Sequence, residues 1–179
     1  MEKITKLRKS FKKFNLDGYI IPKNNNFFGE YIPSSEDNLK YISNFTGSAG
    51  FAVILKDRNY MFVDGRYTIQ AEKQCGKEFK ICNIPKEYPF RIFKNKNLNL
   101  GFDPKLHTEN SLKKLFGNSF TKLRPINENL IDFVWRREKN SKIKPFYLMK
   151  DQDAGSKVQK KLDILINLIK LNKADYLFS

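Results

Sequence analysis

Apolar side chains at spacings of three and four open the chain, with lysines between them. Residues spaced in this way share one face of a helix, so the pattern predicts an amphipathic helix that residues 15–18 end. The apolar run 19–21 predicts a short buried strand, which Pro22 stops. A second helix is expected to begin at Ser34 or Ser35, where a serine cap precedes two acidic residues. The inward-facing residues of these helices are Ile4, Leu7, Phe11 and Phe14, then Leu39 and Ile42.

Two apolar segments joined by a polar turn predict a β-hairpin. Residues 51–55 (FAVIL) and 60–63 (YMFV) flank four turn-forming residues. Because both strands are apolar at every position, we expect them in the centre of a sheet. The segments that follow predict, in order, a helix over 67–74, an outer strand over 79–84, a strand over 98–102, a helix that Thr108 caps and Gly117 ends, a strand over 120–124 and a helical stretch over 129–137.

The carboxyl-terminal part of the chain changes character at residues 138–145 (EKNSKIKP), which are polar and basic and are typical of a linker. Beyond them, Ser156 is expected to cap a long helix, and residue 175 to begin a strand. A helix and one strand cannot bury their apolar faces alone, so residues 146–179 are expected to start a second domain. The prediction is an α/β fold in which residues 1–137 form one domain. The first helix and strand of a similar domain follow.

Composition limits the class of protein. No stretch of the 179 residues approaches the roughly 20 uninterrupted apolar residues of a membrane span, which excludes a membrane-embedded protein. The basic amino-terminal segment lacks the apolar core and cleavage site of a secretory signal, so we expect a cytoplasmic protein.

The net charge of +15 is typical of proteins that bind nucleic acid, but 27 of the basic residues are lysine and only 7 are arginine. Arginine is the residue suited to bidentate phosphate and base contacts, so nucleic acid is not expected as the main partner.

Few side chains are suited to metal binding. The two cysteines, Cys75 and Cys82, and the one histidine, His107, are too few for the roughly four convergent ligands of a zinc site. We therefore expect no metal site in this chain. The cysteines are expected to be buried, reduced thiols, and His107 to lie at the surface or to cap a helix.

Two glycine-containing motifs flank the hairpin. Residues 45–50 (FTGSAG) precede its first strand, and residues 64–67 (DGRY) follow its second. Such glycines allow close backbone approach or a turn with positive φ, and the motifs alone leave these roles open. A phosphate-binding loop is excluded, because the glycines of residues 45–50 precede a strand instead of following one and opening a helix.

Six short segments, taken in order, resemble the amino-terminal part of aminopeptidase P, the Xaa-Pro aminopeptidase family of the creatinase and prolidase superfamily. The resemblance extends to about residue 137, and residues 174–177 (ADYL) resemble the start of the family's second domain. The six segments are DGYIIP (17–22), GEYI (29–32), FTGSAG (45–50), DGRY followed by QA (64–67 and 70–71), GFDP (101–104), and NLID followed by Trp135 (129–132).

The resemblance implies that domain 1–137 is a mixed β-sheet flanked by helices, and that a similar domain begins after it. It also implies that the chain is the non-catalytic amino-terminal region of an enzyme that removes an N-terminal residue preceding proline. The family uses two divalent metal ions, usually manganese, whose ligands all belong to a carboxyl-terminal catalytic domain. We therefore assign no catalytic or metal-binding residue here and expect the chain alone to be inactive. The implied partners are that catalytic domain, a second copy in a homodimer, and peptide substrate only in the full enzyme. The alternative is a stand-alone interaction module of the same fold that binds an acidic protein or peptide.

Three residues are candidates for substrate access or for an interface. Arg66 could reach a carboxylate or a neighbouring subunit, or it could pair internally with Asp64 or Glu30. Glu30 and Tyr31 either border the substrate entrance of the full enzyme or cover the sheet. Phe133 and Trp135 are expected in the core. The motif residues with an expected structural role are Phe45, Gly47, Ser48, Gly50, Asp64, Gly65 and Tyr67.

Overall fold

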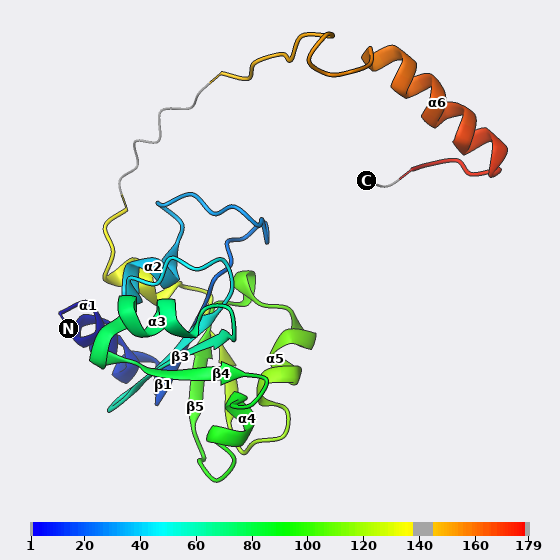
Figure 1. The fold of residues 1–179 in the computed structure, drawn as a ribbon. Helices are drawn as coiled ribbons and strands as arrows, with labels where there is room; N and C mark the ends of the chain where they lie inside the picture. Colours follow the sequence, from blue (N-terminus) through cyan, green and yellow to red (C-terminus); the bar gives the residue numbers. More distant parts are fainter. Residues whose placement is uncertain (1, 138–144, 178–179) are drawn as a thin grey trace. The chain divides into compact units, whose positions relative to one another are not determined.

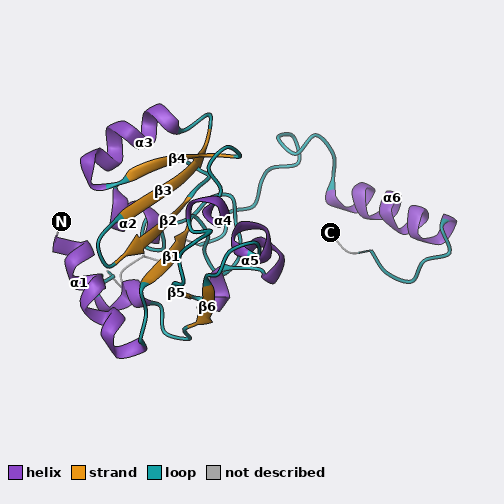
Figure 2. Cartoon of the chain, turned by 90° about the horizontal axis from the view of Figure 1, so that it is seen from below, coloured by secondary structure: helices purple, strands orange, loops and turns teal. Residues whose placement is uncertain are grey.

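A computed structural model describes residues 2–137 and 145–177 of the chain, which divides into two compact units, Met1–Lys139 and Asn140–Ser179. The first unit contains a six-stranded sheet with helices on both faces (Figures 1 and 2). Its strands run in the order β4-β3-β2-β1-β5-β6. They are β1 (Gly18–Pro22), β2 (Phe51–Leu55), β3 (Asn59–Asp64), β4 (Lys80–Ile84), β5 (Asn99–Phe102) and β6 (Lys122–Pro125).

The sheet is mixed because β2 alone runs against the other strands. It pairs antiparallel with β1 and β3, whereas β1–β5, β5–β6 and β3–β4 are parallel pairs. The predicted hairpin is therefore confirmed, its strands are interior to the sheet, and the segment predicted as an outer strand forms the edge strand β4.

Alternate residues of the central strands supply two separate hydrophobic cores, as the two-residue period of a strand requires. In β3, Met61 and Val63 face the core beneath α1 (Glu2–Phe11), α2 (Asn38–Ser43) and α3 (Thr68–Cys75). Tyr60 and Phe62 face the opposite core, covered by α4 (Pro89–Ile92) and α5 (Glu109–Phe116). This two-sided burial explains why β1 and β2 are apolar at almost every position.

The cysteines lie on opposite faces of this sheet. Cys75 belongs to the core beneath α1–α3, and Cys82 on β4 belongs to the other core. Both are buried and free, as predicted, and burial raises the pKa of each thiol to about 11. Because the sheet separates them, they cannot form a disulfide with each other without a rearrangement of the fold.

Two predicted helices of the first unit differ from the structure. The second helix begins at Asn38 and not near Ser34 or Ser35, because the carboxylate of Asp37 accepts the Lys40 N–H at 3.0 Å and caps it. The stretch predicted as helical over 129–137 forms only a 3₁₀ turn over Leu130–Phe133. Trp135, beyond that turn, stacks on Tyr41 with ring centroids 4.4 Å apart.

The second unit contains α6 (Val158–Leu171), a helix with no buried residue, whose apolar side chains are exposed except for the half-buried Ile169. Ser156 does not cap it, since Lys157 occupies the N-cap position. The strand predicted from residue 175 is not present over residues 175–177, and residue 178 lies outside the described residues. Most of the predicted linker, residues 138–144, also lies outside them, so the predicted domain boundaries stay a prediction. In the part of the chain that the structure describes, no helix is long and apolar enough to cross a membrane.

Candidate functional site

The loops that carry the candidate residues converge on one edge of the sheet. Because β1, β3, β4, β5 and β6 share a direction, their carboxyl ends lie together, and β2 begins at the same edge (Figure 1). We call this the carboxyl edge. It carries Glu30 and Tyr31 after β1, the motif 45–50 before β2, and Arg66 after β3. Ligands of open α/β sheets bind outside the carboxyl ends of parallel strands, which makes this edge the candidate site.

The glycines of the motif 45–50 allow a tight packing of backbone on side chains. A Cβ at Gly47 would lie 2.2 Å from Cζ of the buried Phe45, so this glycine packs against the tip of the ring. Gly50 has a φ of +150°, and a Cβ there would approach the carbonyl oxygen of Phe62 on the neighbouring strand to 2.9 Å. Both glycines are therefore needed for close approach at the entry to β2.

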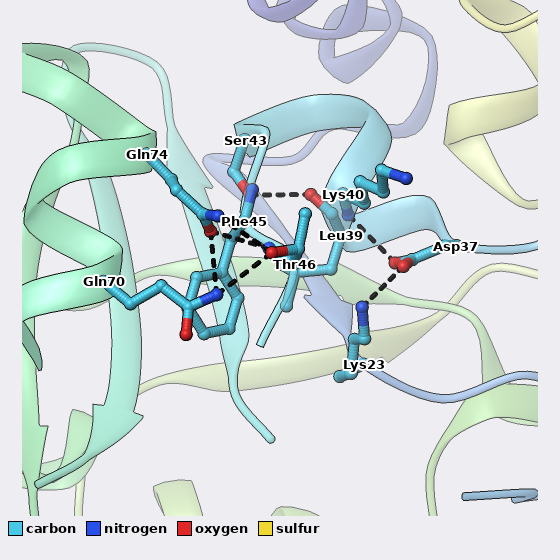
Figure 3. A network of polar contacts seen from close by, with 9 residues as sticks. All are labelled: Lys23, Asp37, Leu39, Lys40, Ser43, Phe45, Thr46, Gln70 and Gln74. Atoms are coloured by element: carbon cyan, nitrogen blue, oxygen red, sulfur yellow. Dashed lines mark hydrogen bonds and ion pairs between the residues drawn. The ribbon is translucent and has the colours of Figure 1, made fainter. Parts of the chain in front are cut away.

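A network of side-chain amides fixes the same loop to α3 (Figure 3). The Thr46 hydroxyl oxygen accepts hydrogen bonds from Nε2 of Gln70 at 3.0 Å and from Nε2 of Gln74 at 2.8 Å. Gln74 in turn accepts the Thr46 N–H at 2.9 Å. These two partners of Thr46 were not predicted from the sequence. The signal for them is the i, i+4 spacing of the two glutamines, which places both on one face of a helix.

The motif 64–67 forms a self-contained turn. Arg66 donates to both carboxylate oxygens of Asp64, at 3.1 Å from Nε and 2.8 Å from Nη2, and this hydrogen bonding lowers the pKa of Asp64. The Arg66 side chain is nevertheless exposed and also lies over the Tyr67 ring. Tyr67 shares a hydrogen bond of 2.7 Å with the Ser48 hydroxyl, which joins the two motifs. Gly65 has open space around it and no positive φ, so it serves neither a close approach of the backbone nor a turn with positive φ.

Glu30 and Tyr31 lie in the loop between β1 and α2, which the side chain of Asn25 organises. Asn25 is 7% exposed, accepts the Phe27 and Gly29 N–H groups, and donates to the Glu36 carboxylate. The loop presents aromatic side chains to solvent, with Phe27 83% and Tyr31 89% exposed. Tyr31 therefore does not cover the sheet.

A buried ion pair anchors this loop at both of its ends (Figure 3). Lys23, directly after β1, contacts the Asp37 carboxylate, and the side chains are only 11% and 8% exposed. Asp37 also caps α2, and the Lys23 N–H donates to the carbonyl of Gly50. One pair of charges thus holds together β1, α2 and the glycine motif.

Two further expectations are wrong in part. His107 is half-buried and occupies the C-cap position of the 3₁₀ turn Pro104–Leu106, but it does not cap α5, which Thr108 caps. Its ring packs edge-on against Phe102, and burial lowers the pKa of His107 to about 4. Phe133 is 55% exposed rather than in the core, whereas Trp135 packs against the core as expected. Among residues 2–137 and 145–177, no group of three His, Cys, Asp or Glu side chains could hold a metal ion.

The mixed six-stranded sheet with helices on both faces is an α/β domain of the creatinase/prolidase N-terminal class. A model of the creatinase/prolidase N-terminal domain matches residues 3–130, and the chain belongs to this family. Relatives within the family include Xaa-Pro aminopeptidases. It is 34% identical over 150 residues to a probable Xaa-Pro aminopeptidase P of Laccaria bicolor, covering 79% of this chain and 23% of that protein. It is 32% identical over 170 residues to Xaa-Pro aminopeptidase 2 of Mus musculus, covering 89% and 25%.

Solved structures agree with this assignment. An X-prolyl aminopeptidase of Caenorhabditis elegans, described as a cytosolic enzyme with a di-nuclear active site, matches 97% of this chain and 31% of its own, with a TM-score of 0.74 and 25% identity. The N-terminal domain of the peptidase PepQ from Mycobacterium tuberculosis shares the fold, with a TM-score of 0.59 and 20% identity over 75% of this chain and 98% of that one. The chain spans about a quarter of the length of the curated relatives it matches.

Substitution of Gly50 and of Gly65 by alanine distinguishes a glycine that the fold requires from one that it does not require. We expect Gly50→Ala to lower the free energy of unfolding by about 1–3 kcal/mol, because the new Cβ meets the β3 backbone at a φ that L-residues rarely adopt. Gly65→Ala, made as the matched control, is expected to change it by no more than about 0.5 kcal/mol. Urea denaturation followed by circular dichroism measures both; equal losses would contradict the assigned roles.

Removal of the buried carboxylate should be far more damaging than removal of an exposed one. We expect Asp37→Ala to cost about 3–5 kcal/mol of unfolding free energy, because Lys23 keeps its charge in a buried site. Asp64→Ala, which breaks the exposed pair with Arg66, serves as the control and should shift the unfolding midpoint far less. A larger shift for Asp64→Ala than for Asp37→Ala in the same denaturant titration would refute the anchoring role of the pair.

Proposed function

We propose that this chain is the non-catalytic amino-terminal region of an Xaa-Pro aminopeptidase, and that its carboxyl edge borders the path of the peptide substrate and contributes to subunit contacts. The observation that supports the proposal most directly is that the family model covers residues 3–130 and that the relatives over this region are named Xaa-Pro aminopeptidases. Because the C. elegans relative is described as cytosolic, we propose the same location for this protein.

The described residues do not fit a centre of two divalent metal ions, because they provide no cluster of carboxylate and histidine ligands. We therefore place the metals, and the activation of water that two such ions supply, in a part of the enzyme that this chain does not match. The names of the relatives give no support to the alternative, a stand-alone module for an acidic partner.

The exposed aromatic side chains at the carboxyl edge support the role in substrate access. Tyr31 and Phe27 project from a loop that Asn25 and the Lys23–Asp37 pair hold in place. These contacts fix the loop in a conformation that leaves both aromatic side chains exposed to solvent. Aromatic faces offer large contact area to a peptide or to a neighbouring subunit at a small entropic cost.

The absence of catalysis by this chain can be measured directly. Purified chain, incubated with manganese chloride and an Ala-Pro-Pro tripeptide, is expected to release no alanine above the buffer blank. The C. elegans X-prolyl aminopeptidase in the same assay provides the positive control. Chelator-sensitive release of alanine in proportion to the concentration of this chain would overturn the non-catalytic assignment.

The access role is tested in a chimera in which this chain replaces the matching region of the C. elegans enzyme. We expect Tyr31→Ala to raise KM several-fold and to leave kcat nearly unchanged, because the loop acts on binding and not on the chemical step. Phe120→Ala is the control, since Phe120 is also an exposed aromatic residue (72%) but precedes β6, at the opposite edge of the sheet. Equal kinetic effects of the two substitutions would argue against a role of the carboxyl edge.

A further inference from the structure

A cleft of about 610 Å³ opens at the carboxyl ends of β1, β5 and β6, entirely within the first unit. Its walls come from the end of the first helical segment, the loop after β1, the loop after β5 and the stretch after β6. The volume lies within the range of small-molecule sites, and the position is the one that open α/β sheets use for ligands.

The charge of the cleft is opposite in sign to that of the chain. Four carboxylates line it against three cations, whereas the whole chain carries a net charge of +15. Two of the carboxylates are paired within the cleft, Glu128 with Lys13 at 3.6 Å and Asp132 with Arg137 at 2.6 Å. A third, Glu36, accepts a hydrogen bond from Asn25.

Asp103, the fourth carboxylate, is the most buried of them and is not neutralised. It is 5% exposed, and its Oδ1 accepts the Lys105 N–H at 2.9 Å, yet it forms no ion pair with any residue that the structure describes. Asp37 at the same edge, equally buried, has Lys23 as its cation. Lys105, the third cation of the lining, contacts Asp103 through its backbone N–H only, and no ion pair joins the two side chains. Burial of a carboxylate without a directly paired cation is unfavourable, and a bound cation would relieve it.

We propose that this cleft binds a primary ammonium group and that Asp103 is its counter-ion. A metal ion does not fit, since the described residues contain no cluster of three suitable ligands. An ammonium group needs one carboxylate and further hydrogen-bond acceptors, which the side chains of Asn26 and Asn127 supply in the lining, and Leu106 and Phe133 accommodate an aliphatic or peptide tail. The amino terminus of a peptide and an aliphatic diamine share this chemistry. The proposal does not depend on the peptidase assignment.

The titration uses the full chain and three probes: Ala-Ala amide, 1,4-diaminobutane, and N-acetyl-Ala-Ala amide, which lacks the ammonium group. We expect the peptide or the diamine to bind at millimolar concentration or below, measured by shifts of amide resonances in NMR, and the acetylated peptide to bind at least about tenfold more weakly. Binding of the peptide and not the diamine identifies an amino terminus as the ligand, and the converse identifies a diamine.

The variant Asp103→Asn removes the charge but keeps the oxygen that accepts the Lys105 N–H, so the turn remains capped. We expect it to bind the ammonium probe at least about tenfold more weakly and to melt at the same or a higher temperature, since no internal cation loses its partner. Asp64→Asn, a carboxylate that Arg66 neutralises, should bind like the unmodified chain. Unchanged binding by Asp103→Asn, equal binding of the acetylated peptide, no binding of either ammonium probe, or a strongly lowered melting temperature of Asp103→Asn would each overturn the proposal.

Discussion

The sheet depends on strand β1, which joins its two halves. β1 pairs antiparallel with β2 on one side and parallel with β5 on the other, and all five of its residues are buried. The close approach requires a glycine, because a Cβ at Gly18 would lie 2.6 Å from the carbonyl oxygen of Ile54. Directly before it, the carboxylate of Asp17 accepts the Asn99 N–H at 2.9 Å and pairs with Lys56, so the same point holds β5 and the hairpin turn. Both halves of the sheet are therefore positioned from one end of β1.

The opposite end of β1 positions the candidate site in a similar manner. Lys23 follows the strand at once, and its buried pair with Asp37 fixes the start of α2, while its backbone fixes Gly50. Between these anchors the chain forms a loop whose interior is the side chain of Asn25 and whose surface is aromatic. Rigid ends and a polar interior allow Tyr31 to remain exposed in a defined place, which is what a surface that contacts a peptide or a second subunit needs.

The sequence was sufficient to predict those elements whose local residue pattern agrees with their packing in the fold. The hairpin and its central position follow from two runs of apolar residues, and the edge strand β4 follows from apolar residues mixed with polar ones. Thr108 caps α5, as its position before the apolar periodicity predicted. It was insufficient where a residue distant in sequence determines where a helix begins or ends. Asp37 rather than a serine starts α2 because Lys23, 14 residues earlier, holds its carboxylate. The helix expected over 129–137 stops after one turn, and Arg137 beyond it donates to the carbonyl of Ser35 and to Asn38.

The same distinction applies to the site residues. The motifs 45–50 and 64–67 lie directly before and after the two strands of the hairpin, so their proximity could be predicted, but the φ of Gly50 and the open space around Gly65 could not. Asp103 lies within the GFDP motif, and the sequence indicates no role for its carboxylate, because its burial without an ion pair exists only in the folded chain. Net charge is a property of composition, whereas the charge of a cleft depends on which side chains the fold brings together. A chain with fifteen excess positive charges can therefore contain a cleft that is suited to a cation.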